Sequence, residues 1–259
     1  MSWFQNDCIL SDERPEEMVA EGVLLKRRSF FRLSAATVAA GLAASCATVA
    51  GGKGSGAALL DEPGADGALD LAEFMAQMSP RAKQFIASGG QLEEAYLMGL
   101  GELMARLETP TYDQAMSSMR AHVDGRRSAG QPIEFVTLMF ELEPGKGFPH
   151  HDHRNYNGVI LGVEGEVRIK NYDFVEADTV APKGETFQIR QTRDELLLPD
   201  RFSTLGTSRD NIHEVVAGPE GATVLDVFTF MTEDAQSYNM EVESEPRDAE
   251  RGIFDATWS

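Results

Sequence analysis

The sequence predicts a mainly β fold, a double-stranded β-barrel or jelly roll, preceded by a small helical segment. After Pro132, short apolar runs alternate with Gly and Pro turns, a pattern typical of barrels and double-sheet jelly rolls. Between Leu69 and Val123, apolar residues instead recur every three or four positions, which is the period of an amphipathic helix. Three of the five histidines fall within residues 150–153, just after the first predicted strand.

Composition limits the classes of function. A chain of 259 residues with 42% hydrophobic residues can form a sizeable core, as one large domain or two small ones. The formal net charge of −19 argues against nucleic acid and anionic membrane surfaces as partners, because both would repel the chain. The two cysteines, Cys8 and Cys46, precede the predicted folded part. Zinc-finger and cysteine-hydrolase functions are therefore excluded, as is an internal disulfide in the barrel.

Residues 1–46 are predicted to be an export signal. Lys26–Arg28 precede a run of small and apolar residues at 34–45, which is the plan of a bacterial signal peptide and is too short to span a bilayer permanently. The paired arginines, followed by Phe and Leu, resemble the twin-arginine signal. That resemblance implies export of an already folded protein, often one that loads its cofactor in the cytoplasm.

Two features of this region leave alternatives open. Residues 43–46, Ala-Ala-Ser-Cys, resemble a lipoprotein cleavage box. Cleavage there would leave a lipid-anchored Cys46 on the bacterial envelope, whereas ordinary cleavage nearby would leave a soluble periplasmic protein. The true start is Met1 or Met18, since the residues before Met18 lengthen the signal without an obvious purpose.

The folded part begins with helices. Residues 47–67, rich in Gly and Ala, are predicted to be a flexible linker, and residues 68–131 a helical segment. The expected helices cover, in order, residues 71–78, a new helix starting at Ser79-Pro80, residues 92–107, and a segment through Met116, Met119 and Val123. We interpret the methionines as core filler and His122 as structural or surface-exposed.

Residues 132–231 are predicted to form the barrel. The expected strands include Phe135–Phe140, Glu166–Lys170, Thr186–Arg190 and Thr223–Phe230. Residues 232–259 are polar and acidic, and we expect this C-terminal extension to cover the surface.

The stretch Phe148–His153 predicts a metal site. Neutral imidazole is the commonest protein ligand for iron, zinc, copper and nickel. Because residues i and i+2 of a strand point the same way, His151 and His153 can reach one ion together while Asp152 points to the other side. We expect His150 to point away from His151 and not to be a ligand.

The spacing of these residues resembles the first motif of the cupin family. Gly145 is followed by five residues, then His151, one residue and His153, with Gly165 later. The resemblance implies a small β-barrel that carries a metal inside. Many cupins add a glutamate ligand, but the corresponding place here falls near Asn157-Gly158. We therefore expect three histidines without a carboxylate, the third being His213, which is the remaining histidine of the β part.

A longer stretch, roughly Ile133 to Phe230, resembles the thiol dioxygenases, and in particular the cysteamine and N-terminal-cysteine dioxygenases. The segments that carry this resemblance are 149–153, 165–173, 211–213 and 224–227. It implies iron(II) bound by His151, His153 and His213, with dioxygen and a small thiol as substrates and a sulfinate as product. Zinc, nickel or manganese could occupy the same ligand set.

Three further residues are candidates for catalysis. Asp226 lies among apolar residues, and we expect it to hydrogen-bond a ligating imidazole. Arg154 could bind a substrate carboxylate or be an exposed loop residue. The Pro-Pro-Tyr of the family is absent after residue 228; Tyr172, Tyr156 and Tyr238 are candidates for its tyrosine, with Tyr172 otherwise part of the core. A cysteine–tyrosine crosslink, known in related enzymes, is impossible because the barrel has no cysteine.

The sequence thus favours an exported iron thiol dioxygenase. Two alternatives stay open: a cupin dioxygenase that acts on a non-thiol substrate such as an enol or diketone, and a non-enzymatic envelope protein that binds a metal or ligand. Barrels of this kind can pair through edge strands, so a homodimer is one expectation.

Overall fold

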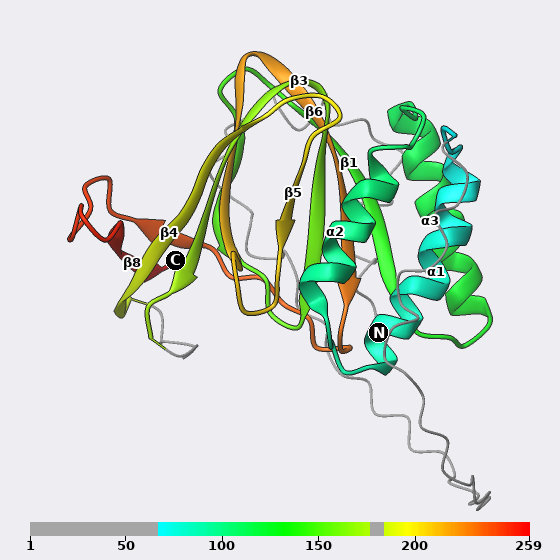
Figure 1. Ribbon diagram of the computed structural model, residues 1–259, viewed down its shortest axis with the longest axis horizontal. Coiled ribbons are helices and arrows are strands. Elements are labelled where there is room, and N and C mark those ends of the chain that lie inside the picture. The colour runs from blue at the N-terminus through cyan, green and yellow to red at the C-terminus, as the bar shows by residue number, and fades with distance from the viewer. Residues whose placement is uncertain (1–66, 177–183) are drawn as a thin grey trace, which may run out of the picture.

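The computed structural model describes residues 67–176 and 184–259. The predicted export signal, residues 1–46, lies outside the described residues, as does the predicted linker up to residue 66. In the described part, three helices precede eight strands (Figure 1). The helices are α1 (Leu71–Ala87), α2 (Glu93–Met104) and α3 (Tyr112–Ser128). None of the helices in this part has the length and apolar character needed to cross a membrane.

Capping residues set the starts of two helices. Asp70 accepts a hydrogen bond from the backbone N–H of Glu73, and the Glu73 side chain accepts one from the Asp70 N–H. Thr111 and Gln114 make the same reciprocal pair at the start of α3. Each pair satisfies backbone donors that a helix start leaves without an intrahelical acceptor.

The helical prediction is wrong at one point. Ser79-Pro80 was expected to start a new helix, but α1 continues through Pro80 to Ala87. A proline inside a helix removes one backbone hydrogen bond. The apolar side of α1 is nevertheless continuous across Pro80, because Met78 and Ala82 are both fully buried. Burial of this side of α1 against the sheet outweighs the local cost of the proline.

The strands form one antiparallel sheet that curls on itself. Their bounds are β1 Phe135–Leu142, β2 Gly147–Asp152, β3 Tyr156–Phe174, β4 Thr186–Leu197, β5 Phe202–Leu205, β6 Ile212–Phe230, β7 Met240–Val242 and β8 Ile253–Trp258. The order is β1-β6-β3-β4-β8-β7, with β2 also paired to β6 and β5 to β3. The mainly β, jelly-roll fold class is therefore confirmed, including the helical segment before it.

The curl comes from the two longest strands. β3 and β6 have 19 residues each and pair along their lengths, with register shifts between Gly162 and Glu164 and between Gly165 and Val167. Gly165 has a φ of +71°, and a Cβ there would lie 2.3 Å from the Gly221 carbonyl oxygen. Only glycine fits this close approach. On the inner face of the bent sheet, Ile160 from one half packs in the same core as Ile169 from the other.

The helices cover the outer face of one half of the sheet. Phe135, Val159 and Val227 pack there against Phe74 and Leu100 in one core cluster. Figure 1 shows the helices grouped on the side of β1 and β5, with β4 and β8 on the opposite side. The inner face of the sheet is thus left free to build a site.

The C-terminal extension differs from its expected role. Residues 232–259 were expected to cover the surface as a polar tail, but β7 and β8 extend the sheet beyond β4. Trp258 is buried and stacks on Phe187, with ring centroids 4.6 Å apart. A few apolar residues spaced along an acidic segment are enough to add a strand, because β4 supplies the backbone partners.

Substituting Gly101 of α2 with alanine should destabilise the fold by about 1–3 kcal/mol through overpacking. A Cβ at Gly101 would lie 2.2 Å from the Phe202 ring of β5. Gly125 of α3 is the control, since a Cβ there meets nothing within 4 Å. Its alanine variant should gain about 0.5–1 kcal/mol. Urea unfolding measures both; equal effects would contradict the packing of α2 on β5.

Candidate metal centre

A bulge in β2 determines which histidine faces the barrel interior. Phe148 pairs with Val215 and His151 with His213, so three steps along β2 match two along β6. The extra residue falls at Pro149-His150. Proline has no N–H to give to a ladder and is tolerated at a bulge. Because the bulge resets the alternation, Phe148 and His151 both point inward.

Three histidines converge on the inner face. One potential ligand atom from each of His151, His153 and His213 lies within 4.8 Å of the others. The Nε2 atoms of His151 and His213 are 2.9 Å apart. Nitrogens that bind one ion at about 2.1 Å in neighbouring positions lie roughly 3.0–3.4 Å from each other. The predicted ligand set is thus brought together by the fold, and its spacing fits a single transition-metal ion.

The hydrogen bonds of these rings also fit a metal. His151 Nδ1 lies 2.8 Å from the Pro149 carbonyl oxygen; a proton on Nδ1 would leave the Nε2 lone pair for a metal. His153 is buried, and neither of its ring nitrogens has a hydrogen-bond partner in the described part. Buried polar atoms are normally paired, so a nitrogen without a partner inside a histidine cluster is expected where an ion binds.

Burial keeps two of the ligands neutral. It lowers the pKa of His153 and His213 well below the usual 6.5, and the positive charge of neighbouring histidines lowers it further. A metal ligand must be deprotonated. Both rings are therefore ready to bind at neutral pH without first releasing a proton.

No carboxylate is grouped with the three histidines in the described part of the chain. Among the described residues, the group of possible ligands consists of the three histidines alone. Gly158 has no side chain, and a Cβ there would lie 3.0 Å from the Phe228 ring. Asn157 donates instead to Glu93 of α2, at 2.8 Å. Neither residue belongs to the group of possible metal ligands found among the described residues.

Aromatic rings surround the histidines. Tyr156 stacks on His153 with ring centroids 4.4 Å apart, and Phe228 lies 5.7 Å from the same ring. Phe148 meets His151 edge-on at 6.5 Å. Sequence reasoning did not assign Phe148 and Phe228 to the site. These two residues could be assigned to the site only from the register between paired strands, which no single segment of the sequence shows.

Asp226 lies inside the barrel but not where it was expected. It is directly opposite Leu138 of β1 and Ile160 of β3, and is 3% exposed. The expected bond to a ligating imidazole is absent, because Asp226 Oδ1 and His213 Nδ1 are both buried without a partner among the described residues. Burial raises the pKa of Asp226 well above its usual 3.8. The side chain is therefore a neutral carboxylic acid over a wider pH range than an exposed aspartate.

Tyr172 is part of a separate cluster. It pairs with Ile212, whereas its neighbour Asn171 pairs with His213, so Tyr172 points to the other face of the sheet. Its hydroxyl lies 3.2 Å from His150 Nε2. His150 also points away from the three ligands, as predicted. The alternative interpretation of Tyr172, a core residue, agrees with its 2% exposure.

Arg154 joins β2 to the C-terminal strands. Its Nε donates to Asp152 at 2.6 Å, and its guanidinium lies 5.2 Å from the centre of the Tyr238 ring and 5.4 Å from that of Trp258. These partners hold the guanidinium on the face opposite to the His153 ring. The geometry corrects the expectation that Arg154 binds a substrate carboxylate.

His122 is structural, as one interpretation of the sequence proposed. It lies in α3, and its ring packs on Phe135 with centroids 4.6 Å apart. It is not among the grouped ligands.

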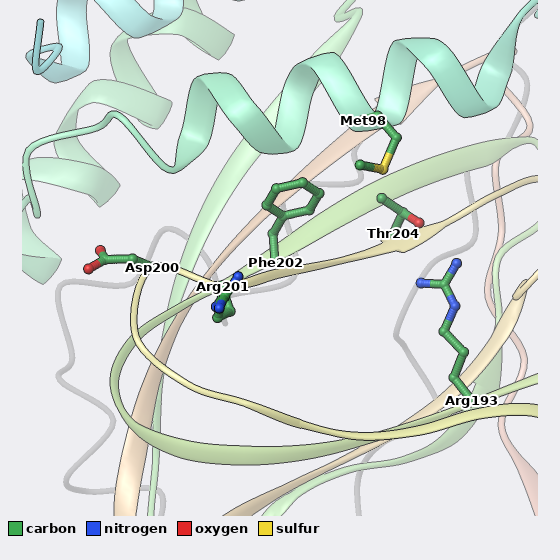
Figure 2. A pocket seen from close by; sticks show the side chains of 6 residues that line it. All are labelled: Met98, Arg193, Asp200, Arg201, Phe202 and Thr204. Atoms are coloured by element: carbon green, nitrogen blue, oxygen red, sulfur yellow. The ribbon is translucent and has the colours of Figure 1, made fainter. Parts of the chain in front are cut away.

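A pocket of about 310 Å³ lies away from these histidines, between α2, β5 and β4 (Figure 2). Met98 points from α2 toward Phe202 and Thr204 of β5, and Arg193 of β4 closes one end. The lining residues are Met98, Arg193, Asp200, Arg201, Phe202 and Thr204. The pocket does not include a metal ligand.

No protein-family model and no curated protein matches the chain. Several solved structures resemble part of it. An 11S allergen from Cocos nucifera is 14% identical over 40% of this chain and 24% of its own, with a TM-score of 0.30. An oxalate oxidase is 12% identical over 40% of this chain and 45% of its own, with a TM-score of 0.30. Procruciferin, an 11S globulin from Brassica napus, is 12% identical over 41% of this chain and 22% of its own, with a TM-score of 0.31. The chain spans less than half the length of each of these proteins.

Substituting Asp226 with asparagine should change stability in a pH-dependent way. The folded protein retains a proton that the unfolded chain releases above pH 3.8, so the free energy of unfolding of the unaltered protein falls as pH rises through the raised pKa. Asparagine does not ionise, so the stability of Asp226→Asn relative to the unaltered protein should increase as pH rises above about 3.8.

Asp194→Asn is the control, because hydrogen bonding to Arg168 lowers the pKa of Asp194. The contribution of Asp194 is lost as pH falls, so its asparagine variant should show the opposite and weaker trend. Urea unfolding at several pH values measures both variants. Parallel pH profiles for Asp226→Asn and the unaltered protein would contradict the buried neutral acid.

Proposed function

We propose that this protein is a non-haem iron dioxygenase that oxidises a small thiol, or the thiol of a terminal cysteine, to a sulfinate. The observation that carries the proposal is the convergence of three histidines inside the barrel, with which no carboxylate of residues 67–176 and 184–259 is grouped. Three neutral ligands leave the positive charge of the metal uncompensated and leave coordination positions open. Both properties favour an anionic ligand such as a thiolate.

The thiol and dioxygen together supply all the atoms and electrons that the overall reaction needs. The S–H bond of the thiol and the O–O bond of dioxygen break, and two S–O bonds form. Sulfur loses the four electrons that dioxygen gains, and one proton is released from the sulfinic acid. When bound by His151, His153 and His213, iron(II) would supply positions for the thiolate and dioxygen and their electronic activation.

Side chains around the histidines exclude water and restrict orientation. The rings of Phe148, Tyr156 and Phe228 contact the ligand imidazoles. Apolar rings beside the ligands would restrict the orientation of the substrates and strengthen electrostatic interactions there.

Asp226 has a proposed role as a hydrogen-bond donor. It shares the inner face with Phe228, two residues along β6, which contacts His153. Since burial keeps its carboxyl group protonated well above the usual range, it can donate to an oxygen that gains charge during the reaction. Asp226 is therefore the residue outside the ligand set that we assign to catalysis.

Oxygen uptake with a panel of thiols tests the function. Protein loaded with iron(II) under anaerobic conditions should consume one dioxygen per sulfinate formed with at least one of cysteamine, cysteine, 3-mercaptopropionate or a short Cys-first peptide. His213→Ala should reduce turnover to background because it removes a ligand. His122→Ala is the matched control and should keep activity within about twofold, since that ring packs on Phe135 outside the site.

Other outcomes distinguish the alternatives. Oxygen use that does not respond to any thiol would favour a cupin dioxygenase with a non-thiol substrate. A stably bound metal without turnover would favour a metal-binding envelope protein. Absence of sulfinate from every thiol would reject the thiol version.

Export is also part of the proposal. It is supported by the twin-arginine-like sequence at residues 26–33. Cell fractionation would test it, with Arg27→Lys/Arg28→Lys expected to retain the protein in the cytoplasm. Palmitate labelling that depends on Cys46 would distinguish a lipid anchor from a soluble periplasmic form.

A further inference from the structure

His153 lies just beyond the part of β2 that pairs with β6. The register of these strands ends with Asp152 opposite Ile212. The side chain of Asn211 continues the pairing. Its Oδ1 accepts from the His153 N–H at 3.2 Å, and its Nδ2 donates to the His153 carbonyl oxygen at 2.6 Å. One carboxamide thus satisfies both backbone polar groups of a ligand residue that is itself 1% exposed.

Asn211 also binds the loop that leads into β6. Its Nδ2 lies 2.9 Å from the Gly206 carbonyl oxygen and 3.1 Å from that of Thr207. Thr207 is held in turn by Glu93 of α2, which accepts from its N–H at 3.0 Å and from its hydroxyl at 3.1 Å. The amide is therefore fixed from both sides, and it is 5% exposed.

The residue before Asn211 is in an unfavourable conformation. Asp210 has a φ of +54°, which costs a non-glycine residue about 1 kcal/mol or more. Its surroundings hold it there: its carboxylate pairs with Arg193 at 2.8 Å and accepts from Thr192 at 2.5 Å. Its N–H donates to Asp173 at 2.6 Å. This turn directs Asn211 toward His153, while His213, two residues later, faces the barrel interior.

We propose that Asn211 is a positioning residue that fixes His153 relative to His213, so that two ligands from separate strands meet one ion. The inference rests on the metal centre of the proposed function. His151 and His213 are held by direct strand pairing, and the His151 ring has Pro149 as a partner. His153 has no strand partner on the β6 side, although its neighbour Arg154 pairs with Gln236 on the other side. Its ring stacks on Tyr156, and its own N–H and carbonyl oxygen are held by Asn211.

Cobalt(II) binding, followed by visible absorption, tests this role without turnover. Asn211→Ala should weaken Co(II) affinity by about 10- to 100-fold, the usual effect of losing a group that orients a ligand. The absorption bands should shift because the His153 ligand moves. Asn211→Asp keeps an acceptor for the His153 N–H but loses the donor, so it should cause a smaller loss.

Asn157→Ala is the matched control. Asn157 is also a buried asparagine of the barrel, but it donates to Glu93 and not to a ligand residue. It should lower the melting temperature of the metal-free protein as Asn211→Ala does, yet leave Co(II) affinity within about twofold. If Asn211→Ala does not fold, the Co(II) affinity of Asn211→Asp tests whether Asn211 positions His153.

The outcomes separate the inference from the function on which it rests. An unaltered protein that does not bind Co(II) would reject the metal centre itself. Co(II) binding that is unchanged in both Asn211 variants would reject the positioning role and leave the metal centre intact. Equal loss of affinity in Asn157→Ala and Asn211→Ala would also overturn it, since general loosening of the barrel would then explain the effect.

Discussion

The pairing of β2 with β6 is the constraint on which the candidate site depends. β6 is paired with β3 from Ile212 to Phe230, so the position of His213 is fixed by a ladder much longer than the site. The site then forms if β2 pairs with β6 in the correct register. A slip of one residue would move every side chain of β2 to the other face, exchanging His151 for His150. The bulge at Pro149-His150 and the bridge between His151 and Asn239 hold the productive register.

The bend of β3 and β6 then places the two halves of the sheet face to face. Phe228 and Asp226 come from one half, and His213 and Asn171 from the other. The consequence is electrostatic. Although the chain has a formal net charge of −19, this interior holds two histidines whose pKa burial lowers and an aspartate whose pKa burial raises. Burial thus favours the neutral form of all three side chains. A cation bound there would be the dominant charge.

The sequence predicted the features that depend on local pattern. Alternation along a strand paired His151 with His153, and the scarcity of histidines left His213 as their partner. Features that depend on distant partners were not predictable. The guanidinium of Arg154 packs on Trp258 from the C-terminal end of the chain, and the hydroxyl of Tyr172 lies beside His150 because of the bulge. Both side chains therefore lie outside the histidine cluster, contrary to the prediction. The C-terminal strands were missed because β4 provides their pairing. The new helix predicted at Ser79-Pro80 does not form, because burial of its apolar side keeps α1 continuous. Pro149 is the one local sign of the bulge.

Several buried polar atoms of the candidate site have no hydrogen-bond partner among the residues that the structure describes. Buried atoms without a partner in the described part include both ring nitrogens of His153, Nδ1 of His213, Oδ1 of Asn171 and Oδ1 of Asp226. Each such atom costs about 1–3 kcal/mol, and the backbone of Asp210 nearby is also unfavourable. Natural proteins accept such costs at functional sites and offset them elsewhere in the fold. An ion that takes up the His153 lone pair would offset part of this cost and bind the folded state alone, so metal binding and the stability of the barrel are coupled.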